Sequence, residues 1–143
     1  MVQEAFTKTA ASIFARFPMT NNRMAHFHTL RVADIHQETP ECIVVGFDVP
    51  PELRKEFAFQ HGQYVTLKLT VNGEDLRRSY SICSSPLDAD QFRIAVKKVP
   101  QGRASTQLVD KLKPGMSVEV MTPMGSFTTA LDPSKSRHFV AFA

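Results

Sequence analysis

Short stretches of alternating apolar and polar residues predict an antiparallel β protein from residue 27 onward. The clearest stretch is residues 41–49, where Ile43, Val45 and Phe47 fall on one face of a strand. Similar patterns predict further short strands at residues 28–36, 63–70, 78–80, 91–99 and 116–121. In the last of these, Met116, Val118 and Val120 are expected on one face.

Turn residues divide these strands. Asn72-Gly73 predicts a tight hairpin, because a type I′ turn needs positive φ at both central residues. The prolines at positions 50 and 51 end a strand, and residues 52–60 then suit a turn or short helix. Residues 107–112 show the apolar spacing of one helix face, with Ser105 as the expected N-cap. About six short strands and one short helix predict an all-β barrel or sandwich.

The ends of the chain differ from this central part. Residues 5–17 are apolar with scattered basic residues and could form a short amphipathic helix. Residues 137–143 end in an apolar run without alternation, which is typical of a strand buried in a parallel sheet. We therefore expect an N-terminal extension at residues 1–26, a barrel at 27–132, and the first strand of an α/β domain at 133–143.

Composition excludes several classes of protein. The chain has 143 residues, 43% of them hydrophobic and 22% charged, which is ordinary for a globular domain. The net charge of +3 is too small to favour nucleic-acid binding, and no apolar run approaches the ~20 residues that span a membrane. Two cysteines fit neither a zinc motif nor a disulfide framework, so a cytoplasmic setting is expected. The five histidines show no ligand spacing, and no metal site is expected.

Candidate chemistry centres on residues 77–86, where polar groups are dense on a predicted strand. Alternation places Arg78 and Tyr80 on one face, and Ser79 and Ser81 on the other. A guanidinium beside an aromatic ring suits a ligand with a phosphate and a flat ring. The alternative is an exposed strand face on which an arginine lies beside a tyrosine.

A second candidate is the Gly102-Arg103-Ala104-Ser105 segment, which precedes the predicted helix. The start of a helix binds anions through its free N–H groups and its dipole. Together with Arg78, this segment predicts a pyrophosphate site. Lys97 and Lys98 add positive charge, although a solvated strand end explains them equally well.

Five motifs in order resemble the ferredoxin–NADP reductase-like flavoproteins, and they cover roughly residues 27–143. Arg78-Ser79-Tyr80-Ser81 is similar to the family's Arg-x-Tyr-Ser signature. The other four are His61-Gly62-Gln63-Tyr64, Val96-Lys97-Lys98, Gly102-Arg103-Ala104-Ser105 and Pro123-Met124-Gly125-Ser126-Phe127. Two positions depart from the family pattern: His61 stands where a proline is usual, and Gln101 replaces the first glycine of the phosphate loop. The segment around Arg78 resembles most the reductase components of multicomponent oxygenases.

The resemblance implies a six-stranded antiparallel Greek-key barrel with one short capping helix that binds FAD. It implies that Tyr80 stacks on the flavin ring and that Ser81 lies near the atom that receives hydride, as the catalytic residues. Arg78 would bind the pyrophosphate. The implied cofactor contacts come from Arg78, Ser79, Tyr80, Ser81, Val96, Lys97, Gly102, Arg103, Ala104 and Ser105.

The resemblance also implies partners. The longer protein would take electrons from NAD(P)H through FAD to a 2Fe-2S centre and then to an oxygenase or a ferredoxin-type acceptor. The NAD(P)H and 2Fe-2S sites are expected outside these 143 residues, and no nucleic-acid or membrane partner is expected. Two alternatives remain open: a stand-alone flavin-binding module without catalysis, and a small β-barrel that binds protein or nucleic acid.

Overall fold

The structure is a computed structural model that describes residues 26–88, 90–130, 132, 134–138 and 140. The expected helix at residues 5–17 and most of the expected strand near residues 139–143 lie outside these residues. Within the described part of the chain, no helix is long and apolar enough to cross a membrane.

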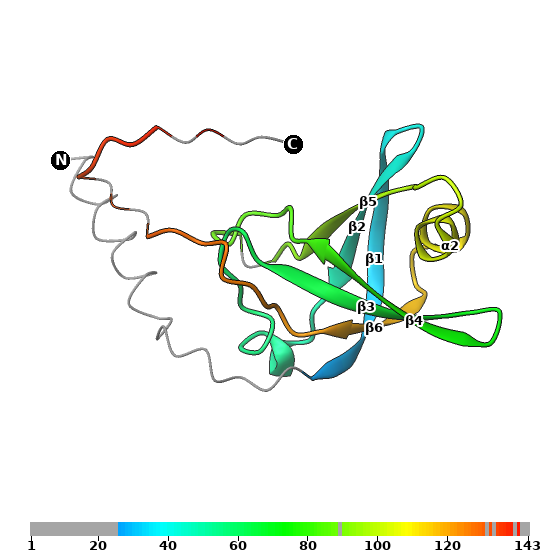
Figure 1. Cartoon of the computed structure of the whole chain (residues 1–143). Helices are drawn as coiled ribbons and strands as arrows, with labels where there is room; N and C mark the ends of the chain where they lie inside the picture. The colour runs from blue at the N-terminus through cyan, green and yellow to red at the C-terminus, as the bar shows by residue number, and fades with distance from the viewer. Residues whose placement is uncertain (1–25, 89, 131, 133, 139, 141–143) are drawn as a thin grey trace.

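Six strands form one antiparallel sheet, as the sequence predicts (Figure 1). Their order in the sheet is β4-β3-β6-β1-β2-β5, so neighbours in space are often distant in sequence, as a Greek-key barrel requires. The strands are β1 (Phe27–Thr39), β2 (Cys42–Asp48), β3 (Tyr64–Val71), β4 (Glu74–Ser81), β5 (Arg93–Lys97) and β6 (Ser117–Met121). A short 3-10 helix, η1 (Pro51–Leu53), follows β2 where a turn or short helix was expected.

The alternating apolar residues converge on one core. Val45, Val65 and Val120, from three different strands, are fully buried. Burial of such side chains stabilises the fold by roughly 1.5–3 kcal/mol each. Met116 is an exception to the predicted pattern, because it precedes β6 and is 46% exposed. Its backbone is used instead, since its carbonyl accepts a hydrogen bond from the N–H of Val32 at 2.8 Å.

The Asn72-Gly73 hairpin is confirmed. Both residues have positive φ, 53° at Asn72 and 80° at Gly73, and they join β3 to β4. The hairpin fixes the register in which Val65 faces Tyr80 and Leu67 faces Arg78.

The sheet does not close into a complete ring. Its two outer strands are β4 and β5, and between them the described residues form a single antiparallel bridge, Ile82–Ile94. One further hydrogen bond, from the N–H of Cys83 to the carbonyl of Arg93 at 2.9 Å, supports that junction. In the part of the chain that the structure describes, β4 and β5 are therefore joined just beyond the end of β4.

The capping helix starts earlier than the sequence predicts. Helix α2 (Arg103–Lys111) packs against β3 and β5, and in Figure 1 it lies between the ends of the β1–β2 and β3–β4 hairpins. Its N-cap is Gly102, so the prediction that Ser105 is the N-cap was wrong. Ser105 lies inside the first turn, where its hydroxyl accepts a hydrogen bond from the N–H of Val99 at 3.1 Å.

Candidate cofactor-binding site

Strand β4 presents a cation and an aromatic ring on the same face. Arg78 is opposite Leu67 and Tyr80 is opposite Val65, and both partners are fully buried, so this face turns toward the core. Arg78 is exposed because β4 is an outer strand, and its Nη1 donates to the carbonyl of Arg77 at 2.7 Å. The predicted pairing of the two side chains on one face is therefore confirmed.

The ring of Tyr80 is half-buried and packs against the core. Burial raises the pKa of Tyr80, and the positive charge of Arg78 acts in the opposite direction. Tyr80 is consequently a neutral phenol at physiological pH, with one part of the ring fixed and one part accessible. A ring held in this way can stack on a planar ligand.

The serines of the signature lie on the opposite face. The hydroxyls of Ser79 and Thr66 are 3.0 Å apart, and Ser81 is exposed opposite Tyr64. A ligand on the face of Tyr80 would therefore meet Ser79 and Ser81 through their backbone atoms.

The site lies where β4 and β5 separate. Continuing the register of the Ile82–Ile94 bridge would place Tyr80 opposite Val96, but no ladder forms there among the described residues. The outer edges of both strands thus keep backbone groups without a strand partner, and such groups need another hydrogen-bonding partner. A flat ligand with a polar edge can supply those partners.

The two β5 residues predicted for the site differ in exposure. Val96 is fully buried in the core, so its side chain cannot face a ligand and only its backbone is available. Lys97 is exposed at the end of β5, opposite Cys42.

The start of α2 suits an anion. Gly102 provides no side-chain cap and the first turn itself contains no acidic residue, so its N–H groups have no side-chain partner within the helix. A β-carbon on Gly102 would lie 2.5 Å from Ser105 Oγ and 2.9 Å from the carbonyl oxygen of Val99, so only glycine fits this turn. Ala104, in the first turn, is buried.

The guanidinium of Arg103 already has partners within the protein. It forms an ion pair with Glu74 at 2.8 Å and donates to the carbonyl of Val71 at 3.4 Å. The guanidinium therefore faces the β3–β4 hairpin, and it would have to exchange Glu74 for a phosphate to serve as a ligand.

Gln101 adopts a φ of 60°, a conformation that suits glycine. This is the position where the resemblance places the first glycine of a phosphate loop. The backbone at this position therefore adopts a conformation that a glycine would accommodate without strain.

Sequence reasoning missed the role of Gln63, which connects three segments. Its Oε1 accepts from the N–H of Gln60 at 2.8 Å, its Nε2 donates to the carbonyl of Gly125 at 3.2 Å, and its own carbonyl accepts from the N–H of Ile82 at 3.0 Å. Gln63 is only 8% exposed. The signal in the sequence was a polar residue beside Gly62 at the start of a strand, where a buried amide must find partners.

No group of three or more histidine, cysteine, aspartate or glutamate residues in the described part of the chain could hold a metal ion. His61, which stands where the family has proline, instead accepts a hydrogen bond from the N–H of Thr129 at 3.3 Å through Nε2.

These features fit FAD. The uncapped helix start and the guanidinium of Arg78 each suit a phosphate group, the ring of Tyr80 suits a flavin, and the separated strands offer backbone partners to a polar ring edge. The fold and the site together define a flavin-dinucleotide-binding barrel.

The chain belongs to the family described as the oxidoreductase FAD-binding domain, which it matches over residues 29–129. It is 38% identical over 120 residues to one of the subunits of the 1,2-phenylacetyl-CoA epoxidase of Escherichia coli, covering 84% of this chain and 33% of the relative. It is 36% identical over 125 residues to the glycine betaine monooxygenase reductase subunit of Pseudomonas aeruginosa, covering 87% and 34%.

Among solved structures, phthalate dioxygenase reductase aligns with a TM-score of 0.60 and 27% identity, over 75% of this chain and 32% of that one. That protein is described as a modular structure for electron transfer from pyridine nucleotides to [2Fe-2S]. The chain spans about one third of the length of the curated relatives that it matches.

Proposed function

We propose that this chain is the flavin domain of an NAD(P)H-dependent reductase that delivers electrons to an iron–sulfur centre and an oxygenase. The observation that carries the proposal is the shared face of Arg78 and Tyr80 at the separated β4–β5 edge. Membership of a family of oxidoreductase FAD-binding domains supports it, and favours it over a barrel that binds protein or nucleic acid.

The residues have distinct roles in this proposal. Arg78 binds the pyrophosphate and Tyr80 stacks on the ring. Ser79 and Ser81 contribute backbone atoms near the reacting side of the ring, and Val96 does so at its polar edge. Lys97 adds positive charge there. Phosphate oxygens meet the start of α2, at Gly102, Arg103, Ala104 and Ser105.

FAD, when bound, accepts two electrons together from a nicotinamide and releases them singly. The protein's part is to bind and orient the cofactor. Tyr80 would hold one face of the ring, and the unpaired backbone edges of β4 and β5 would offer hydrogen bonds to its polar edge.

The nicotinamide and iron–sulfur sites would belong to other parts of a longer protein, as the modular phthalate dioxygenase reductase suggests. We place the flavin barrel at residues 27–132, after an extension at 1–26, and the start of an NAD(P)-binding domain at 133–143. The similarity to the phenylacetyl-CoA epoxidase protein suggests an oxygenase acceptor of phenylacetate catabolism. The free thiols of Cys42 and Cys83 suit a cytoplasmic location.

The test is the visible absorption spectrum of the purified chain, followed by titration with FAD and then with FMN. We expect a flavin band or tight binding of FAD, with FMN weaker because it lacks the pyrophosphate. Equal affinity for FAD and FMN would contradict the proposed pyrophosphate site. Binding of neither flavin would contradict the flavin function of this chain.

A further inference from the structure

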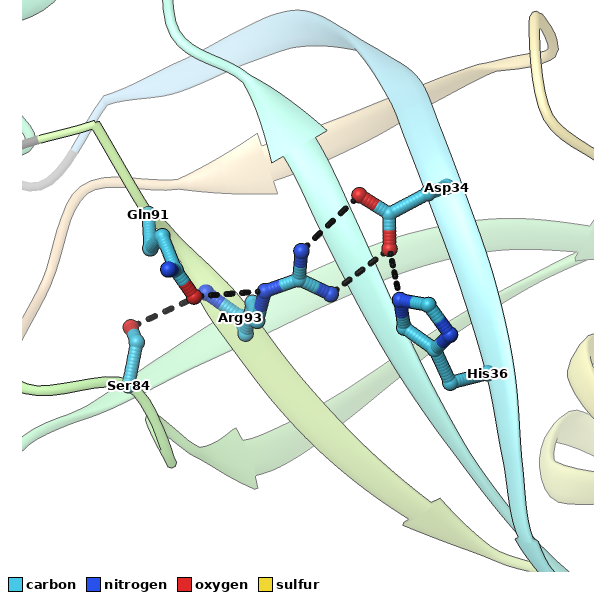
Figure 2. A network of polar contacts seen from close by, with 5 residues as sticks. All are labelled: Asp34, His36, Ser84, Gln91 and Arg93. Carbon is cyan, nitrogen blue, oxygen red and sulfur yellow. Dashed lines mark hydrogen bonds and ion pairs between the residues drawn. The ribbon is translucent and has the colours of Figure 1, made fainter.

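An ion pair crosses three strands on the outside of the barrel (Figure 2). Asp34 of β1, Gly46 of β2 and Arg93 of β5 lie in one cross-strand row, because Asp34 is opposite Gly46 and Gly46 is opposite Arg93. The side chains of Asp34 and Arg93 meet over Gly46. Arg93 donates from both Nη atoms to both carboxylate oxygens of Asp34, at 2.6 and 3.0 Å.

Gly46 makes this pair possible. A β-carbon at position 46 would lie 2.9 Å from Oδ2 of Asp34, closer than real β-carbons approach. Glycine weakens a strand interior, so its place in the middle of a buried strand needs a reason. The missing β-carbon leaves room for the Asp34–Arg93 ion pair to cross the strand, and this accounts for the glycine.

Arg93 also holds the segment that follows β4. Its Nε donates to Oε1 of Gln91 at 3.0 Å, and its backbone N–H donates to Oγ of Ser84 at 3.1 Å. Its carbonyl accepts from the N–H of Cys83 at 2.9 Å, next to the Ile82–Ile94 bridge. Figure 2 shows Ser84 and Gln91 on one side of Arg93, and Asp34 with His36 on the other.

The pair is partly shielded from solvent. The side chain of Arg93 is 22% exposed and that of Asp34 is 39% exposed, whereas that of His36, whose Nε2 is 3.1 Å from Asp34, is 63% exposed. A bidentate, partly buried pair fixes the direction of a guanidinium better than an exposed pair does. The backbone of Arg93 is thereby fixed at the junction where, among the described residues, the barrel closes.

We infer that Asp34 and Arg93 are positioning residues that set the distance between β4 and β5, and hence the slot for the flavin ring. The junction formed by Ile82, Cys83 and Arg93 comes directly after Ser81, so its placement determines where Tyr80 and Ser81 lie relative to β5. This inference rests on the proposed FAD binding. Neither residue contacts the ring, and both act through the junction.

The chain offers a matched control. Arg31 and Asp48 form another ion pair between β1 and β2, at 3.1 Å, with both side chains more than half exposed. Asp48→Asn removes the carboxylate of an ion pair that also involves β1, without touching the junction. Asp34→Asn removes the carboxylate that binds the guanidinium of Arg93.

The experiment compares Asp34→Asn, Asp48→Asn and the parent chain by FAD titration and by the fluorescence and visible circular dichroism of FAD at saturation. We expect Asp34→Asn to weaken FAD binding by at least about fivefold, the lower end of usual coupling between two sites. We also expect bound FAD to be less quenched in that variant, because the ring is less well placed on Tyr80. Asp48→Asn should leave affinity and spectra unchanged, and Gln91→Ala should give a weaker form of the Asp34→Asn effect.

A purely structural role gives a different result: Asp34→Asn would lower the melting temperature while affinity and the spectra at saturation match the parent, and that would overturn the inference. Hydrogen exchange of the Cys83 amide separates this result from a failure of the proposed function. If no variant binds FAD, the flavin function fails, yet faster exchange at Cys83 in Asp34→Asn alone would still support the positioning of the junction. Unchanged exchange at Cys83 would overturn the positioning role as well.

Discussion

Arg103, the first residue of α2, forms an ion pair at 2.8 Å with Glu74, the first residue of β4. Glu74 therefore places a negative charge beside the helix start that is proposed to bind phosphate. Both side chains are about half exposed, 48% for Arg103 and 61% for Glu74, so the pair contributes less than about 1 kcal/mol to stability.

Replacing that carboxylate should favour the cofactor. We expect Glu74→Gln to tighten FAD binding by a few fold, roughly 0.5–1 kcal/mol. The change frees the guanidinium of Arg103 and removes a negative charge that would repel the phosphates. Asp75→Asn is the control, since Asp75 contacts Thr70 and Lys68 instead. Titration at low and high salt measures both, and an equal gain from Asp75→Asn would point to net charge alone.

Arg78 can be separated from its neighbour Arg77. Arg78→Ala should weaken FAD binding by about 1.5–3 kcal/mol, the usual worth of a hydrogen bond to a charged group. The guanidinium of Arg77 lies 5.2 Å from the ring centroid of Phe27, so Arg77→Ala should cost about 0.5–1 kcal/mol of folding stability and leave FAD affinity alone. Titration and urea unfolding of both variants would reveal a reversed pattern if the phosphate role belonged to Arg77.

Tyr80 should quench the fluorescence of bound flavin. Tyr80→Ala removes the stacking surface and should weaken binding by about 0.5–1.5 kcal/mol, whereas Tyr80→Phe keeps the ring and should bind nearly as the parent does. The fluorescence of saturated samples reports stacking directly. Quenching that survives in Tyr80→Ala would place the flavin ring elsewhere.

Gln101 carries conformational strain that glycine would relieve. A left-handed conformation costs a residue other than glycine about 1–2 kcal/mol. A glycine would avoid this cost, but it loses more conformational entropy on folding, which offsets about 0.5–1 kcal/mol of the gain. Gln101→Gly should therefore raise the free energy of unfolding by about 0.5–1 kcal/mol. Gln101→Ala is the comparison in urea unfolding, and a similar gain from alanine would mean that the side chain, not φ, is responsible.

The sequence predicted the strands well because alternation and turn chemistry are local. Val45 and Val65 followed from a period of two, and the hairpin at Asn72 and Gly73 from their tolerance of positive φ. The shared face of Arg78 and Tyr80 followed from the same period.

Features set by contacts distant in sequence could not be predicted. Ser105 was expected to cap a helix, but its hydroxyl instead meets the N–H of Val99 in the preceding loop. The opening between β4 and β5 depends on how six strands curve around one core. The ion pair of Asp34 with Arg93 joins residues 59 positions apart, and only the register of β2 brings them together.

The separation of β4 from β5 has a consequence for the chain without its cofactor. Two strand edges are then exposed, and such edges invite pairing with another molecule. Positive side chains are a common protection against that association, and Arg78 and Lys97 lie on these two strands. The cations that suit an anionic cofactor would thus also keep the empty domain from aggregating, and the cofactor, once bound, would cover the edges in their place.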